Sequence, residues 1–252
     1  TDNGGWAKFI AHWRCHPVYS KRPDYLESIR RTKKLPENKL QREYNLSFDE
    51  GSSQLFPRAL VLRSLCGEWG IPGWSQQYFV GIDPNFGGSD YWVCQVWHYS
   101  NGKYRLVDEY RANRQTKDYH LLKTIAICDR WYPQVVGIES NGGGQLIIED
   151  LIKARPRLNI EAIATTNASK IVNTDRLVLM LERGLLELPP NCTLAEEFAS
   201  FRETVNKTGS SRIRSATSGK NDDTVMAAAI AFAAWTNVEP VDINLFLDTI
   251  AG

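Results

Sequence analysis

The chain has 252 residues, 42% of them hydrophobic, which is enough for one full-sized core and an appendage. Its 30 Lys and Arg nearly balance its 29 Asp and Glu, and the resulting net charge of +1 neither requires nor excludes a nucleic-acid partner. The five cysteines are scattered and form no CxxC, and the four histidines form no HExxH, which argues against a zinc site or a disulfide framework and favours a reducing cytosol. No apolar run is long enough to span a membrane, and no signal peptide is recognisable.

Residues 1–77 differ from the rest of the chain. They begin without an initiator Met, which suggests a fragment or a processed product. The stretch SKRPDYLESIRRTKKLPENKLQREYNL holds eight Lys and Arg against four acids and is broken by Pro36, which predicts short helices. Gly, Ser and Pro residues near GSSQLFP and GIPGW then predict a linker. Two interpretations stay open for this stretch: a basic arm near DNA, or a solvated helical face.

Regular structure begins after Gln77. Alternating and apolar runs predict a three-strand meander, a helix, and then strands and helices in alternation, which implies an α/β fold with a mixed sheet and helices on both faces. The predicted strands are 78–83, 91–98, 103–110, 134–140 and 159–164, and the predicted helices include 115–131, 145–154 and 169–184. We expect the tryptophans at 92, 97, 131 and 235 to fill the core.

Two acids end apolar strands. Asp83 closes the strand in GIDPNFGGSD, and Glu139 closes the strand in VVGIESNGGG. Asp83 also fits a turn former, whereas glutamate is a poor one. If the two strands are parallel and adjacent, the acids end side by side at the sheet edge where α/β folds place ligands. Crowded carboxylates repel each other unless cations lie between them.

A second pair of acids, Asp222 and Asp223, opens the Ala-rich helix in GKNDDTVMAAAIAFAAW. A helix cap accounts for one aspartate at this position but not for two. Small alanine side chains let a helix approach a sheet closely, which would fix its first turn near the strand ends. Acids from two strand ends and one helix start suit a pair of hard divalent cations, such as Mg²⁺, that promote phosphodiester cleavage.

The ordered set GIDPNFGGSD, VVGIESNGGG and GKNDDTVMAAAIA resembles the nuclease domain of the large terminase subunit of tailed bacteriophages, a member of the ribonuclease H-like and resolvase-like superfamily. The resemblance covers residues 78–237. It implies that Asp83, Glu139 and Asp223 are catalytic, and that these three and Asp222 are the metal ligands. Of the helix pair we favour Asp223, with Asp222 as a cap or supporting acid.

The resemblance also implies function, cofactors and partners. We expect an endodeoxyribonuclease that uses two divalent cations, Mg²⁺ or Mn²⁺, to cut concatemeric viral DNA during genome packaging. Expected partners are double-stranded DNA, the portal protein, the small terminase subunit and an ATPase domain of the same polypeptide. The expected location is the host cytoplasm, where procapsids assemble, with no membrane partner.

The family's ATPase motor is not encoded in these residues. LQREYNLSFDEGSSQLFP is similar to the segment that ends the ATPase region, but no GxxxxGK[ST] loop is present. The segment SATSGKND does not qualify, because the Gly required five residues before Gly219 is Arg214. We therefore expect residues 1–77 to be a linker arm left from the ATPase side, 78–237 to be the nuclease domain and 238–252 to be a tail. The tail carries Leu245, Phe246 and Leu247, which would pack on the domain or on a partner.

DNA contacts are expected beside the acids. The segment TVNKTGSSRIRSATSGK carries four basic residues and no acid in a Gly and Ser context, which suits a flexible hairpin that contacts phosphates; a solvated loop is the alternative. Lys170, in a segment similar to the family's Lys-containing helix start, would hold a phosphate or a metal-bound water, or lie free in solvent. The predicted DNA-binding residues are Lys170, Lys207, Arg212, Arg214 and Lys220.

Two other classes of protein remain open. A sugar-kinase-like or actin-like ATPase shares the sheet order and begins with an Asp and a Gly-rich turn, but it needs two copies of the domain. A non-catalytic DNA-binding or portal-docking module would use the same acids only as caps and turn formers.

Overall fold

The computed structural model describes residues 12–37, 40, 44–45, 54–73, 76–86, 90–205 and 212–238. Its contacts divide the chain into two units, Thr1–Ser53 and Gln54–Gly252. The sequence places the start of the main domain at residue 78, whereas this unit starts earlier because Leu55, Phe56 and Val61 are buried in its core. The predicted tail lies outside the described residues, except for the helical backbone of Val238.

The first unit contains the short helices that the sequence predicts. They are the 3-10 helices η1 (Trp13–Cys15) and η2 (Tyr19–Lys21) and the helix α1 (Tyr25–Lys33). Tyr25 is buried, and its ring lies 4.6 Å from the ring of Tyr19 and 5.1 Å from that of Trp13, between centroids. The lysines and arginines of η2 and α1 are exposed or half-buried, which fits both interpretations of this basic stretch.

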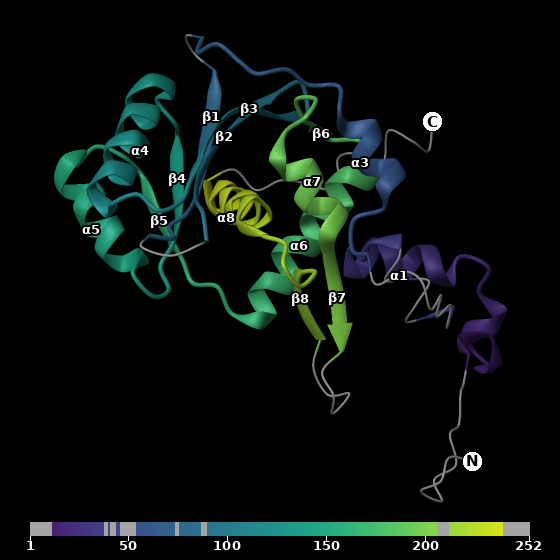
Figure 1. Cartoon of the computed structure of the whole chain (residues 1–252). Coiled ribbons are helices and arrows are strands. Elements are labelled where there is room, and N and C mark those ends of the chain that lie inside the picture. Colours follow the sequence, from purple (N-terminus) through teal and green to yellow (C-terminus); the bar gives the residue numbers. More distant parts are fainter. Residues whose placement is uncertain are drawn as a thin grey trace, which may run out of the picture. The chain divides into compact units, whose positions relative to one another are not determined.

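A six-stranded mixed sheet forms the centre of the second unit, in the order β5-β4-β1-β2-β3-β6 (Figure 1). The first three strands form an antiparallel meander, while β4 is parallel to β1, β5 to β4 and β6 to β3. The bounds are β1 (Gln77–Asp83), β2 (Trp92–Ser100), β3 (Lys103–Ala112), β4 (Val135–Glu139), β5 (Ile160–Ile163) and β6 (Leu186–Glu187). This topology confirms the predicted mixed sheet. The two-residue strand β6 was not predicted, because so short a strand carries no periodicity.

Helices cover both faces of the sheet, as predicted. Along β1 the side chains alternate, so Tyr78, Val80 and Ile82 join one buried cluster and Phe79 joins the other. The first cluster lies under α4 (Lys117–Trp131) and α5 (Gly144–Ala154). The second lies under α3 (Arg58–Ser64), α6 (Asn167–Glu182), α7 (Thr193–Ser200) and α8 (Asp223–Val238). The four tryptophans expected in the core, at 92, 97, 131 and 235, are all buried. None of the described helices is long and apolar enough to span a bilayer.

The helix α8 lies unusually close to the sheet. A Cβ atom added to Gly81 of β1 would lie 2.1 Å from the carbonyl oxygen of Ala227 and 2.6 Å from the Cβ of Ala231. A Cβ atom on Gly137 of β4 would lie 2.8 Å from the Cβ of Ala234. Glycines on the strands and alanines on the helix therefore permit this approach together, which confirms the expected role of the alanines and places the first turn of α8 at the strand ends.

We expect Gly81→Ala to lower the free energy of unfolding by about 3 kcal/mol, because an added methyl group forces α8 away from β1. Gly137→Ala, whose added Cβ would make longer contacts, should lower it by less. Urea unfolding followed by tryptophan fluorescence measures both values. Wild-type stability of Gly81→Ala would contradict the close packing.

Candidate active site

Asp83 and Glu139 lie side by side at one edge of the sheet. The parallel pairing of β1 with β4 matches Ile82 with Ile138, so the next residue of each strand is an acid at the same edge. Asp83 is only 5% exposed. Burial raises the pKa of Asp83 well above its ordinary value, and the charge of Glu139, a hydrogen bond to it and the charges of Asp223 and Asp222 raise that pKa further. The predicted adjacency of the two strand-end acids is confirmed.

Asp223, the first residue of α8, comes close to Asp83. Its Oδ2 accepts a hydrogen bond from the backbone N–H of Tyr91 at 3.2 Å. The side-chain amide of Asn85 donates to Oδ1 of Asp83 and to Oδ1 of Asp223, both at 3.5 Å, so it lies between the two carboxylates. Burial raises the pKa of Asp223 to about 6, against the lowering effect of the Tyr91 N–H. The structure therefore brings together acids from two strands and one helix.

Asp222 lies beside this cluster and has other partners. Its carbonyl oxygen accepts a hydrogen bond from the N–H of Met226 at 2.9 Å, so Asp222 begins the helical hydrogen bonding of α8. Its Oδ2 lies 3.0 Å from Nζ of Lys170, at the start of α6. Both side chains are about three-quarters buried. Lys170 is thus near the acids, as predicted, and it forms an ion pair in place of the solvated position that was the alternative.

The four acids suit hard cations by their chemistry. All donors are carboxylate oxygens, the ligands that Mg²⁺ and similar ions prefer. The pKa of Asp83 is raised in part by the charges of its acidic neighbours, a repulsion that a bound cation would relieve. Within the described part of the chain, no three His, Cys, Asp or Glu side chains are already arranged to hold an ion. The case for a divalent cation at this site therefore rests on the chemical type of the four carboxylates and on their convergence.

The predicted basic hairpin is present. It consists of β7 (Phe201–Val205) and β8 (Arg212–Ala216), which pair antiparallel. Lys207 lies outside the described residues. Arg212 is about one-third exposed and lies 3.8 Å from a carboxylate oxygen of Glu203, and Lys220 is exposed in the turn before α8. These two basic side chains remain candidates for phosphate contact.

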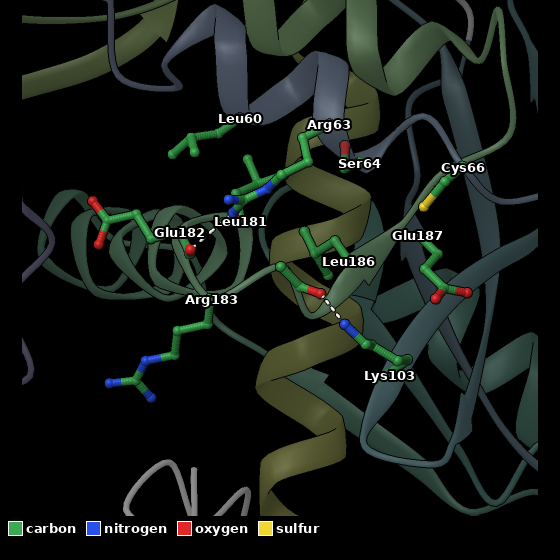
Figure 2. A pocket seen from close by; sticks show the side chains of 11 residues that line it. Leu60, Arg63, Ser64, Cys66, Lys103, Leu181, Glu182, Arg183, Leu186 and Glu187 are labelled. Carbon is green, nitrogen blue, oxygen red and sulfur yellow. Dashed lines mark hydrogen bonds between the residues drawn. The ribbon is translucent and has the colours of Figure 1, made fainter. Parts of the chain in front are cut away.

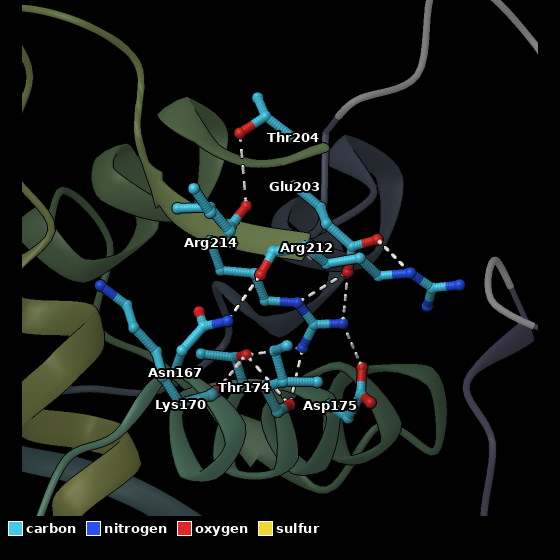
Figure 3. A network of polar contacts seen from close by, with 10 residues as sticks. Asn167, Lys170, Thr174, Asp175, Glu203, Thr204, Arg212 and Arg214 are labelled. Atoms are coloured by element: carbon cyan, nitrogen blue, oxygen red, sulfur yellow. Dashed lines mark hydrogen bonds and ion pairs between the residues drawn. The ribbon is translucent and has the colours of Figure 1, made fainter. Parts of the chain in front are cut away.

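Arg214 was wrongly predicted to bind DNA. It is 2% exposed, and its guanidinium lies in a polar network between the hairpin and α6 (Figure 3). Nε and Nη2 bond to Glu203 at 2.8 and 2.7 Å, Nη2 to Asp175 at 2.7 Å, and Nη1 to Thr174 Oγ1 and the carbonyl of Ile171 at 2.7 Å. Since every donor of the guanidinium is used inside the protein, Arg214 holds the hairpin to α6 and does not contact a phosphate.

Several residues around the acids were not predicted from the sequence. Asn85 and Tyr91 contact Asp223, and Glu197 and Arg111 lie behind them. One signal was present: Glu197 falls on the apolar face of its helix, beside Phe198 and three residues after Leu194, and all three are buried. A buried acid on such a face requires a partner.

A separate pocket of about 340 Å³ lies between α3, α6, β3 and β6 (Figure 2). Nη2 of Arg63 donates to the carbonyl oxygens of Leu181 and Glu182 at 2.9 Å, and Nζ of Lys103 donates to that of Gly184. These cations therefore satisfy the carbonyl groups at the end of α6. None of the four acids lines this pocket, so it is not part of the acid cluster.

Comparisons with known proteins agree with this arrangement. A family model described as "Terminase RNaseH-like domain" matches residues 80–234. The large terminase nuclease of the thermophilic phage G20c with bound magnesium is 20% identical, with a TM-score of 0.64 over 73% of this chain and 98% of that one. Its form with bound cobalt is 22% identical, with a TM-score of 0.61 and the same coverage.

The nuclease domain of the large terminase from Thermus phage P74-26 is 19% identical, with a TM-score of 0.59 over 69% of this chain and 93% of that one. Among curated proteins none matches. These structural similarities confirm the predicted ribonuclease H-like fold.

Proposed function

The chain belongs to the terminase RNase H-like domain family, and from this premise we propose that it is a metal-dependent endodeoxyribonuclease that cuts concatemeric viral DNA during genome packaging. One observation carries the proposal: Asp83, Glu139 and Asp223, far apart in the sequence, converge at one edge of the sheet. Bound magnesium and cobalt in the G20c nuclease support a divalent cation at such a site.

Asp83, Glu139 and Asp223 would hold two divalent cations, Mg²⁺ or Mn²⁺, and Asp222 is a further candidate ligand. When bound, such ions activate the attacking water and neutralise the leaving oxygen of a phosphodiester. The chain's own residues orient the ligands. The amide of Asn85 donates to Asp83 and Asp223, the N–H of Tyr91 donates to Oδ2 of Asp223, and Lys170 forms an ion pair with Asp222.

The proposed substrate is double-stranded DNA, with phosphates contacted by Lys170, Arg212, Lys220 and Lys207. Backbone contacts of this kind give affinity without sequence preference. The proposed partners are the portal protein, the small terminase subunit and an ATPase domain of the same polypeptide, in the host cytoplasm where procapsids assemble. The family match supports a terminase context and a DNA substrate; the named protein partners and the location extend the proposal beyond that match.

A plasmid-nicking assay tests the proposal. With Mn²⁺ or Mg²⁺ the chain is expected to convert supercoiled plasmid to nicked and linear forms, and EDTA should stop the reaction, because the carboxylates alone supply no activated water. Mn²⁺ should also raise the melting temperature, since a ligand that binds only the folded state stabilises it. DNA binding without cleavage, and without any effect of Mn²⁺ on the melting temperature, would instead support the non-catalytic module.

A further inference from the structure

Glu197 of α7 caps the helix that carries Asp223. It is 5% exposed, and its Oε2 accepts hydrogen bonds from the backbone N–H of Thr224 at 2.8 Å and from the Thr224 hydroxyl at 2.5 Å. The first N–H groups of a helix lack partners within that helix, and its N-terminus carries partial positive charge. A carboxylate from another helix thus satisfies the N–H of Thr224 in the first turn of α8.

Arg111 of β3 contacts both Glu197 and Tyr91, the residue whose N–H binds the carboxylate of Asp223. Its Nη2 lies 3.3 Å from Oε1 of Glu197, and its guanidinium carbon lies 3.3 Å from the ring centroid of Tyr91. Tyr91 in turn donates its N–H to Oδ2 of Asp223. The contacts therefore form a closed ring through Arg111, Glu197, Thr224, Asp223 and Tyr91.

We propose that Glu197 and Arg111 are positioning residues that fix Asp223 for metal binding, an inference that rests on the proposed function. The ring holds Asp223 twice: through the peptide bond to Thr224, whose N–H and hydroxyl both donate to Glu197, and through its carboxylate, which accepts from the N–H of Tyr91. Thr224 is fully buried, so it has no water to replace these bonds. Groups that orient metal ligands typically change metal affinity or activity by about 10- to 100-fold when removed.

The proposed positioning role of Glu197 can be distinguished from a role in stability alone. Most of α8 is held by buried apolar side chains packed on β1, β2 and β4. Loss of the cap should therefore leave the helix in place and free only its first turn, where Asp223 lies. A purely structural cap would affect the melting temperature but not the concentration of metal needed to fill the site.

The test uses Glu197→Gln and Thr224→Val in the full 252-residue chain. An amide at 197 lacks the charge that pairs with Arg111, and valine at 224 lacks the hydroxyl. Free Mn²⁺ measured by electron paramagnetic resonance gives half-saturation directly, and nicking at graded Mn²⁺ gives a second value. Both variants should need about 10-fold or more Mn²⁺ for half-saturation, with unchanged circular dichroism. Thr224→Ser, which keeps the hydroxyl that donates to Glu197, should resemble the wild type.

Leu151→Ala is the matched control for lost stability, because Leu151 is fully buried in α5 on the opposite face of the sheet. It should lower the melting temperature and leave Mn²⁺ half-saturation unchanged. The inference is overturned if Glu197→Gln and Thr224→Val behave like Leu151→Ala. Failure of the wild-type chain to bind Mn²⁺ or cut DNA would overturn the proposed function itself, an outcome visible before any variant is compared.

Discussion

Asp83→Ala is expected to lower metal-dependent nicking by about a thousandfold and, at the same time, to stabilise the metal-free protein. The loss follows because each bound ion contributes several kcal/mol of transition-state stabilisation, and about 4 kcal/mol corresponds to about a thousandfold in rate. The metal-free protein should become more stable because the buried carboxylate of Asp83, beside Glu139 and Asp223, is unfavourable without a cation. We therefore expect the free energy of unfolding in EDTA to be higher for Asp83→Ala than for the wild type.

The added stability should depend on pH in a defined direction. The pKa of Asp83 is higher in the folded protein than the value of about 3.9 for an unfolded chain. Protonated Asp83 therefore favours the folded state at low pH, and this contribution is lost as the pH rises through the raised pKa. The difference in melting temperature between Asp83→Ala and the wild type should be larger at about pH 8 than at about pH 5.

Calorimetry in EDTA and plasmid nicking in Mn²⁺ measure the two effects on the same samples. Asp129→Asn is the matched control, because Asp129 pairs with Arg155 at 2.6 Å on the partly exposed surface of α4, away from the acids. It should change neither property by much. Wild-type nicking by Asp83→Ala would refute its role as a ligand, and a lower melting temperature in EDTA would refute the account of charge repulsion.

The acids of this site could be predicted because each one ends or begins an element that the sequence marks clearly. Asp83 and Glu139 end apolar strand patterns, and the helix between them permits the crossover that makes β1 and β4 parallel and adjacent, as the structure shows. Asp223 begins a helix whose alanines match the glycines of β1 and β4. Local pattern and tertiary contact agree at these positions, so the convergence of the three acids could be predicted from the sequence, while their roles as metal ligands stay a prediction.

The supporting residues could not be predicted in the same way. Glu197 meets Thr224 only through the packing of α7 beside α8, and Arg111 reaches both Glu197 and Tyr91 across elements. In β8 the apolar side chain faces solvent and the charged one is buried, the reverse of the usual pattern: Ile213 is 44% exposed and Arg214 is 2% exposed. A basic segment indicates charge, but the acids that neutralise an arginine come from elsewhere in the chain.

Arg214→Met is expected to lower the free energy of unfolding by about 3–5 kcal/mol, the usual cost of removing one partner of a buried ion pair. The substitution leaves the carboxylate of Glu203, whose side chain is 3% exposed, and that of Asp175 without their shared guanidinium. Urea unfolding measures the change. The double variant Arg214→Met/Glu203→Gln should recover part of the loss, because the amide removes the buried charge that Arg214 neutralised.

Arg212→Met separates this structural role from DNA binding within the same strand. The Arg212 side chain is 35% exposed and lies 3.8 Å from Glu203, so its loss should change stability by less than about 1 kcal/mol. If Arg212 contacts a phosphate as proposed, its loss should instead weaken DNA binding and lessen the salt dependence of that binding. If Arg214→Met instead keeps the wild-type stability but binds DNA weakly, Arg214 contacts DNA and the buried network is not its role.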